Sequence, residues 1–363
     1  MRRWLLPEHI EDVLPAEARA IERLRRSILD LFEVHGYELV VPPLLEYLDS
    51  LLSGTGRDLD LATFKLVDQL SGRMLGVRAD HTPQVARIDA HLLNRQGVTR
   101  LCYCGSVLHT VPAGMTKMRE PIQIGAELYG HAGLEADVEI VRLMIAALQR
   151  AGIERLHVDL GNPAIYRAMA ASLDADRAER VFHAVQQKDA VGAGPLAILT
   201  ELNGGAEVIA AARGKLPPAT HAALDALEQL AKACAAPGVD ITFDLAELGG
   251  FNYESGLVFA AFAPGSPDAI ARGGRYDEVG KSFGRARAAT GFTMDLRQLA
   301  ALAKPGGKRS AILAPADADA RAAIDELRQK GEVVIVNLPG HDAAELGCER
   351  RLEKKDGKWR VTS

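Results

Sequence analysis

The chain has 363 residues, of which 48% are hydrophobic and 25% are charged, and its formal net charge is −5. This composition is typical of a soluble globular protein and argues against a disordered chain and against a broad basic surface for nucleic acid. No apolar run approaches the roughly 18 residues of a membrane span, and no apolar segment follows the N-terminal arginines as in a secretion signal. The four cysteines lack the spacing of a metal or disulfide motif. We therefore expect a cytoplasmic protein without a metal site.

The first part of the chain shows alternating helix and strand patterns. Apolar residues at intervals of three and four predict a helix over 16–35, which Gly36 closes, and a strand over 38–41 follows it. Further along, the patterns predict a hairpin of strands 64–67 and 74–77, a helix over 83–93, strands over 101–108 and 120–129, a helix over 137–151 and a strand over 156–160.

The segment from about 162 to 237 is rich in alanine and poor in aromatic residues, which predicts a helical insertion without strands. Strand patterns resume at 241–243 and 256–262, and Gly273–Gly274 suggests a tight turn. The last core segment, 290–302, indicates a strand that runs into a helix.

A linker-like stretch at 304–308 separates this core, residues 1–303, from a small C-terminal piece at 309–363. The patterns there predict strand 310–313, helix 317–330, strand 332–336 and a hairpin around Asp356–Gly357. The chain as a whole indicates an α+β fold with a mainly antiparallel sheet flanked by helices, a helical insertion and a small C-terminal βαβ unit.

Two segments carry polar residues that could hold a small ligand. Asp80 and Thr82, within Val77–Thr82, combine a carboxylate with a hydroxyl, as an ammonium group requires, although they also suit a helix N-cap before Pro83. Gln123 and Glu127 share one face of a strand with Gly125 between them, and together they can bind a carboxylate and an imidazole N–H. The alternative for that strand is a solvated polar face.

Three further segments complete the pattern. The paired glycines of Ala271–Asp277 would let the backbone approach a ligand closely, or would simply form a turn. Gly250–Tyr253 offers a tyrosine, and Gly36–Glu46 combines a helix end and a strand with a rigid proline.

In this order and spacing, the five segments resemble those of class II aminoacyl-tRNA synthetases, and among them the histidyl enzyme, over about Leu6 to Leu302. The resemblance implies the class II synthetase fold and a dimer element at 36–46. It also implies a histidine site, with Asp80 and Thr82 at the amino group, Gln123 at the carboxylate, and Glu127 with Tyr253 at the imidazole.

The positions at which the resembled family binds ATP differ in this chain. His109 stands where the family has the arginine for the ATP α-phosphate, and Val111 stands where it has the glutamate for adenine. The other departures are Gly249 and Gln298 in place of arginines and Asp295 in place of glycine. Since adenylate formation depends on preorganised positive charge, three missing arginines predict its loss. Arg119 and Lys117 remain as candidate anion ligands.

A synthetase-like core without its ATP site resembles the regulatory subunits of short-form ATP phosphoribosyltransferase. The resemblance implies a non-catalytic, allosteric chain without catalytic residues, cofactor or nucleic-acid partner. Such a chain forms a homodimer within a hetero-oligomer with the short catalytic subunit, activates that subunit, and mediates feedback inhibition by histidine in histidine biosynthesis. Two alternatives stay open, which are a stand-alone histidine-binding sensor and an active histidyl-tRNA synthetase.

Overall fold

The computed structural model describes residues 4–54, 57–112, 118–249, 254–303, 310–340 and 343–362. The chain divides into two compact units, Met1–Lys304 and Pro305–Ser363, next to the linker that the sequence indicates. No helix in these described ranges is long and apolar enough to cross a membrane.

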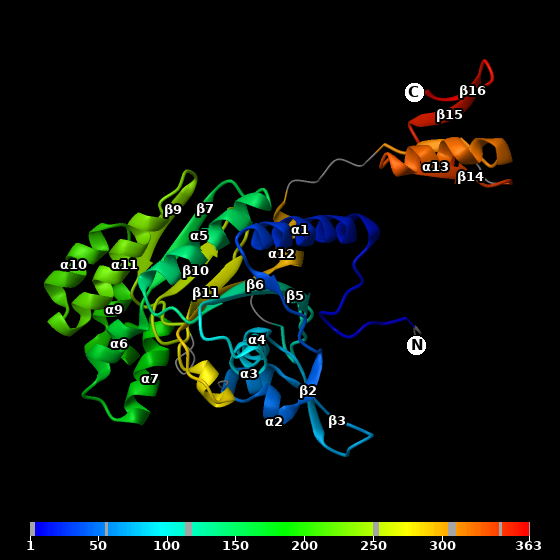
Figure 1. Cartoon of the computed structure of the whole chain (residues 1–363). Coiled ribbons are helices and arrows are strands. Elements are labelled where there is room, and N and C mark those ends of the chain that lie inside the picture. Colours follow the sequence, from blue (N-terminus) through cyan, green and yellow to red (C-terminus); the bar gives the residue numbers. More distant parts are fainter. Residues whose placement is uncertain are drawn as a thin grey trace. The chain divides into compact units, whose positions relative to one another are not determined.

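A mainly antiparallel sheet forms the centre of the larger unit (Figure 1). In spatial order, its strands among the described residues are β1 (Glu38–Leu39), β5 (Thr99–Ser106), β6 (Ile122–Tyr129), β12 (Ala289–Asp295), β11 (Ala271–Arg275), β10 (Val258–Phe262), β7 (Leu156–Gly161), β9 (Val239–Asp244) and β8 (Asn203–Gly204). The strands from β5 to β7 are antiparallel throughout, and parallel pairs occur between β1 and β5 and between β7 and β9. The α+β fold predicted from the sequence is confirmed.

Helices cover both faces of this sheet, and Figure 1 shows the two layers. On one face lie α1 (Pro15–Val34), α5 (Leu134–Arg150) and α12 (Leu296–Leu302), where Phe32 of α1 meets the ring of Phe292 edge-on at 5.9 Å. The other face carries α4 (Thr82–Arg87), the π-helix Ile88–Leu93 and the 3-10 helix Val279–Phe283. The candidate ligand residues lie on this second face.

A small three-stranded sheet adjoins α4. It consists of β2 (Leu45–Tyr47), β4 (Met74–Val77) and β3 (Phe64–Val67), with α2 (Leu48–Leu51) and α3 (Arg57–Ala62) beside it. The hairpin of β3 and β4 has the bounds that the sequence predicts.

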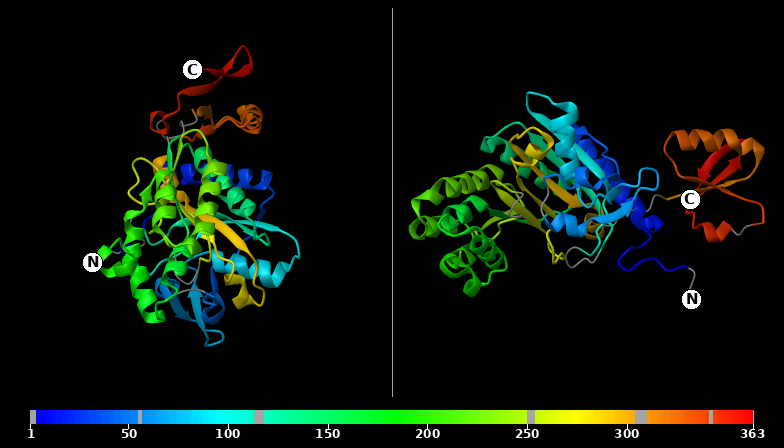
Figure 2. Two further views of the ribbon diagram at one scale, coloured as in Figure 1. Left: turned by 90° about the vertical axis from the view of Figure 1, so that its left-hand side faces the viewer. Right: turned by 90° about the horizontal axis from the view of Figure 1, so that it is seen from below.

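The insertion is helical, as expected, and its helices gather at one end of the main sheet (Figure 2). They are α6 (Pro163–Ala170), α7 (Ala175–Gln186), α8 (Ala190–Ala193), α9 (Ile198–Glu201), α10 (Glu207–Lys215) and α11 (His221–Cys234), with 3-10 turns at Gly194–Leu196 and Pro218–Thr220. The prediction that the insertion contains no strand is wrong, because β8 pairs with the end of β9. Two residues are too few to show the alternation that marks a strand.

The prediction of a turn at Gly273–Gly274 is also wrong, because both glycines lie inside β11. Gly273 pairs with Phe259 on one side and Phe292 on the other. A Cβ at Gly273 would lie 2.2 Å from the carbonyl oxygen of Gly291 and 2.6 Å from the Phe259 ring. Glycine is therefore required here by close packing within the sheet and not by a change of chain direction.

The smaller unit is built on a parallel βαβ arrangement, as expected. Its elements are β13 (Ile312–Pro315), a 3-10 turn at Ala318–Ala320, α13 (Arg321–Gln329), β14 (Val334–Asn337), a 3-10 turn at Ala343–Leu346, and the hairpin of β15 (Arg350–Lys355) and β16 (Lys358–Thr362). β13 runs parallel to both β14 and β15. A small apolar core of its own, which includes Ile312, Ile324 and Leu352, holds these elements together.

Candidate functional site

A buried carboxyl group, that of Glu127 on β6, lies at the centre of the candidate site and is 1% exposed. The hydroxyl of Thr82 donates to Glu127 Oε1 at 3.2 Å, and the hydroxyl of Tyr103 donates to the same oxygen at 3.3 Å. The hydroxyl of Tyr276 donates to Oε2. Three hydroxyls from α4, β5 and the end of β11 thus fix the direction of this carboxyl group, and the alternative of a solvated polar face does not apply.

Two glycines make room for this cluster. A Cβ at Gly291 of β12 would lie 1.6 Å from Glu127 Oε2, and a Cβ at Gly125 of β6 would lie 2.4 Å from the Tyr103 hydroxyl oxygen. Each glycine pairs across the sheet with a residue beside the cluster, Gly291 with Glu127 and Gly125 with Tyr103. These two glycines therefore leave the space that the Glu127 side chain and the Tyr103 hydroxyl fill.

Burial governs the electrostatics of the site. It raises the pKa of Glu127 to about 8, although the hydroxyl of Tyr276 acts in the opposite direction, and the nearby Asp80 carboxyl raises it further. Burial also raises the pKa of Asp80. Both carboxyl groups are thus shifted toward their neutral forms, and a cationic group placed between them would favour their ionised forms. The site is accordingly suited to a ligand that carries an ammonium or imidazole group.

Gln123 lies at the outer end of the same strand face. Its side-chain oxygen accepts from the backbone N–H of His81 at 3.2 Å and lies 2.9 Å from His81 Nδ1. The ring of His81 stacks on Tyr103 with their centroids 4.7 Å apart, and burial lowers the pKa of His81 to about 4. With its oxygen engaged, Gln123 has its amide N–H groups left to donate to Asp80 or to a ligand.

Of the two residues suggested as a helix cap, only Asp80 accepts a hydrogen bond from the start of α4. The N-cap residue of α4 is His81, whose side chain makes no capping hydrogen bond. Asp80 Oδ1 accepts from the backbone N–H of Thr82 at the long distance of 3.4 Å. The Thr82 hydroxyl turns to Glu127 and not to the helix.

Four of the residues expected at the site, Asp80, Thr82, Gln123 and Glu127, come together in the structure, whereas Arg119 lies apart from them. Tyr253 and Lys117 lie outside the described residues. Arg119 donates to the backbone oxygens of His109 at 3.0 Å and Glu8 at 3.4 Å, and its guanidinium group lies over the Phe64 ring.

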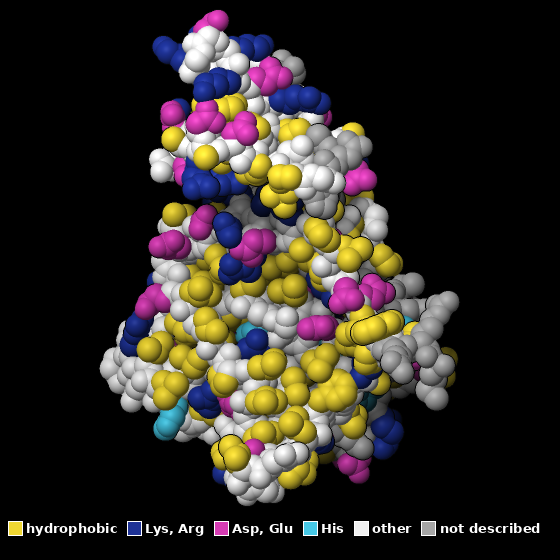
Figure 3. Space-filling view, turned by 90° about the vertical axis from the view of Figure 1, so that its right-hand side faces the viewer, with side chains coloured by type: hydrophobic (Ala, Val, Ile, Leu, Met, Phe, Trp, Pro, Cys, Tyr) yellow, Lys and Arg dark blue, Asp and Glu magenta, His cyan; other side chains and the backbone are white. Residues whose placement is uncertain are grey.

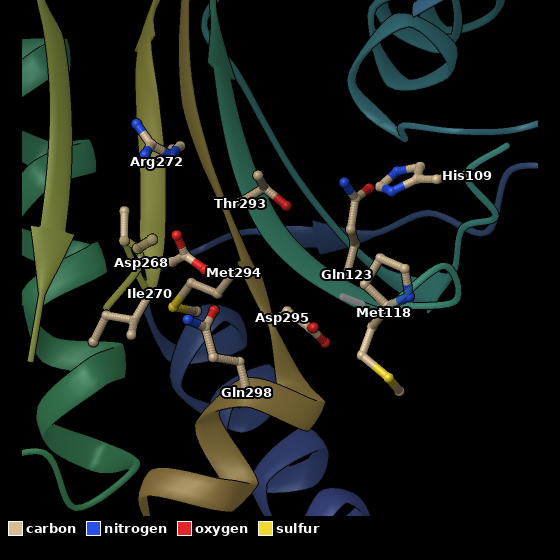
Figure 4. Close-up of a pocket in the computed structure, with 13 residues that line it drawn as sticks. His109, Met118, Gln123, Asp268, Ile270, Arg272, Thr293, Met294, Asp295 and Gln298 are labelled. Carbon is tan, nitrogen blue, oxygen red and sulfur yellow. The ribbon is translucent and has the colours of Figure 1, made fainter. Parts of the chain in front are cut away.

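A cavity of about 330 Å³ opens beyond Gln123, between β6, β12 and β11 (Figure 4). The polar residues that line it are His109, Gln123, Asp268, Arg272, Thr293, Asp295 and Gln298. Three of the positions that differ from the ATP site of the resembled synthetases, His109, Asp295 and Gln298, line it, and Arg119 does not. Asp295 caps α12, because its carboxylate accepts from the backbone N–H groups of Ile122 at 3.1 Å and Arg297 at 2.9 Å.

The conformation of Gly249 disfavours the arginine that the resembled family has there. Gly249 has a φ of +58°, in the left-handed region that favours glycine. A Cβ at this position would lie 1.3 Å from the side-chain oxygen Oε2 of Glu254. The end of the Glu254 side chain therefore lies where a side chain at position 249 would begin.

Comparisons with known proteins decide between the possible families. The profile of the family described as "Histidyl-tRNA synthetase" matches residues 9–299, and that described as "ATP phosphoribosyltransferase subunit HisZ C-terminal domain" matches residues 309–362. Relatives from Cupriavidus metallidurans and Cupriavidus necator, both named ATP phosphoribosyltransferase regulatory subunit, are 56% and 55% identical over 99% of this chain and 98% of their own lengths. The chain belongs to the family of ATP phosphoribosyltransferase regulatory subunits.

Solved structures agree with this assignment to the regulatory-subunit family. A protein from Bacillus halodurans, described as an ATP phosphoribosyltransferase regulatory subunit/histidyl-tRNA synthetase, is 28% identical with a TM-score of 0.81 over 95% of this chain and 96% of that one. A histidyl-tRNA synthetase from Nostoc sp. PCC 7120 shares the fold with a TM-score of 0.78 at 16% identity, over 99% and 97% of the two chains. The class II synthetase-like fold is confirmed.

Sequence reasoning missed two tyrosines of the candidate site. Tyr276 belongs to the segment Ala271–Asp277, which was singled out for its glycines and not for its tyrosine. Tyr103 lies on β5 directly across from Gly125, and the close approach that this glycine permits was the available signal. Among the described residues, no group of three or more His, Cys, Asp or Glu side chains could hold a metal ion.

Proposed function

We propose that this chain assembles with the catalytic subunit of ATP phosphoribosyltransferase in the cytoplasm, raises its activity, and binds histidine as the feedback inhibitor. One observation carries the proposal. The buried acidic cluster around Glu127 is intact, whereas His109, Gly249 and Gln298 stand where the related synthetases have arginines for ATP. An amino-acid site without its ATP site is a sensor, because it can bind a ligand without transforming it.

Histidine would lie along the strand face of β6. Asp80 and Thr82 would bind its ammonium group. Glu127 would accept a hydrogen bond from the imidazole N–H, and Tyr253 would lie beside the imidazole ring. Glu127 suits this role because three hydroxyls already orient it and because its low-dielectric surroundings strengthen a hydrogen bond from a cation or an N–H group. Gln123 would donate an amide N–H to the carboxylate.

The charges around the cavity disfavour adenylate chemistry. Two carboxyl groups, those of Asp268 and Asp295, line it. A phosphoryl-transfer transition state needs positive charge placed in advance around its oxygens. We therefore expect no histidine-dependent ATP–pyrophosphate exchange by the purified chain. Exchange above that of a Glu127→Ala variant would instead support the active-synthetase alternative.

A homodimer is part of the proposal. The segment 36–46, which the resemblance identifies as a dimer element, exposes large apolar side chains, namely Leu39 at 52%, Val41 at 81% and Leu44 at 50%. Hydrophobic side chains gather on the side of the molecule that carries β2 and β3 (Figure 3). Such patches mark interaction surfaces in soluble proteins. Light scattering at micromolar concentration should show a dimer, and Val41→Asp should shift it toward monomer.

The assembly with a catalytic chain is tested by reconstitution. The purified chain is mixed with a short-form catalytic chain, run on a sizing column, and assayed for transfer of the phosphoribosyl group to ATP. We expect co-elution and a rate well above that of the catalytic chain alone. Separate elution with an unchanged rate would refute the partner assignment and leave the stand-alone histidine sensor as the alternative.

A further inference from the structure

The carboxylate of the bound amino acid lacks an evident cationic partner in the proposed site. Gly249 has no side chain, and Arg119 is held by backbone oxygens outside the cavity. The oxygen of Gln123 is engaged with His81, which leaves only a neutral amide for the carboxylate. A carboxylate taken out of water needs stronger compensation than one neutral donor.

Arg272 on β11 is the one arginine or lysine among the described residues that line the cavity. The sheet register places it directly across from Thr293 of β12, which in turn lies across from Gly125 of β6. Neighbouring strands are about 4.8 Å apart, so the Cα of Arg272 lies about 10 Å from that of Gly125. Gly125 separates Gln123 from Glu127, and Figure 4 shows Arg272 and Gln123 on opposite sides of Thr293. Arg272 therefore lies on the sheet face that carries Gln123 and Glu127, at the level of Gly125.

The Arg272 side chain is free to move to a ligand. It is 59% exposed, and its ion pair with Glu247 spans 4.0 Å. Arg275, at the end of the same strand, is held differently, because it is 9% exposed and bound to Asp137 at 2.7 Å.

We propose that Arg272 binds the carboxylate of the amino-acid ligand. This inference rests on the proposed histidine site and specifies its selectivity. Arg272 favours α-amino acids with a free carboxylate over the corresponding alcohols and amides. Asp268 and Asp295 in the same cavity disfavour the more highly charged phosphates.

Calorimetric titration with two ligands tests the role of Arg272. Histidine carries the carboxylate, and histidinol carries a hydroxymethyl group in its place. Arg272→Gln should weaken histidine binding by roughly 10- to 100-fold, as expected for a lost hydrogen bond to a charged group, and should leave histidinol binding within about twofold. Arg272→Lys should recover part of the loss. Arg213→Gln, which removes an arginine paired with Asp225 in the insertion, serves as the matched control and should change neither affinity.

Two results would overturn the inference, and only the second would also refute the proposed histidine site. In the first, Glu127→Gln abolishes histidine binding, but Arg272→Gln weakens the binding of neither ligand or of both equally. The proposed site then stands, and the role of Arg272 is wrong. If the wild-type chain binds no histidine, or binds it equally well with Glu127→Gln, the proposed site fails together with Arg272. Thermal melts of each variant show that any lost affinity is not lost folding.

Discussion

Glu127→Gln should change how the stability of the chain depends on pH. Burial raises the pKa of Glu127 from 4.5 to about 8, so the folded chain binds this proton more tightly than the unfolded chain does. The stabilisation is complete below pH 4.5 and is lost as the pH rises toward 8, because the folded chain must then hold a buried charge. At about 1.36 kcal/mol for each pH unit, the loss amounts to roughly 5 kcal/mol.

Glutamine keeps the shape of Glu127 but cannot ionise, and its amide oxygen can accept from Thr82 and Tyr103 while its NH2 group donates to the Tyr276 oxygen. The variant should match the wild type within about 1 kcal/mol at pH 5 and exceed its free energy of unfolding by several kcal/mol at pH 9. Urea unfolding followed by circular dichroism at pH 5, 7 and 9 measures both, with the exposed Glu201→Gln as control. Parallel pH profiles for wild type and Glu127→Gln would refute the assignment of a buried, neutral carboxyl group.

Two further substitutions test the packing around the site. Gly291→Ala should displace the Glu127 carboxyl group, because the added Cβ would lie 1.6 Å from Oε2, and calorimetry should show histidine binding weakened at least tenfold. Gly97→Ala, at an open position, is the control. Unchanged histidine binding in Gly291→Ala, or equal weakening in both variants, would count against the described geometry. Asp89→Ala should lower the free energy of unfolding by about 3–5 kcal/mol, because it removes the carboxylate that lies 2.8 Å from the buried guanidinium group of Arg287. A loss below about 1 kcal/mol in urea unfolding would show that this ion pair is not important for stability.

Local sequence patterns predicted the elements of the fold that depend on near neighbours. The strands Phe64–Val67 and Met74–Val77 were predicted at their observed bounds, because a short polar turn separates two clear apolar runs. The π-helix at Ile88–Leu93 was predicted only as the end of a longer helix, since its wider hydrogen bonding leaves no mark on apolar periodicity. The predicted turn at Gly273–Gly274 was wrong, because a single sequence does not distinguish a glycine required by a turn from one required by close packing inside a sheet.

The site was predictable where one strand or one turn carries it. Gln123 and Glu127 share a face by the two-residue period, and Asp80 with Thr82 form one short segment. The contacts that complete the site join residues far apart in the chain, such as Tyr276, whose hydroxyl reaches Glu127 across 149 positions. The position of Arg272 opposite Thr293 likewise depends on strand order, which no local pattern specifies.

Histidine inhibition of the reconstituted complex tests the central claim most directly. Inhibition from one chain to another requires that histidine bind more tightly to the less active state of the complex, with a coupling free energy of typically about 1–3 kcal/mol. The transferase rate is measured against histidine concentration with wild-type chain, with Glu127→Gln and with Glu201→Gln. We predict that Glu127→Gln still assembles and activates but needs at least tenfold more histidine for half-inhibition, whereas Glu201→Gln behaves as wild type. A Glu127→Gln complex that remains as sensitive to histidine as wild type would contradict the account and move the sensor to another site.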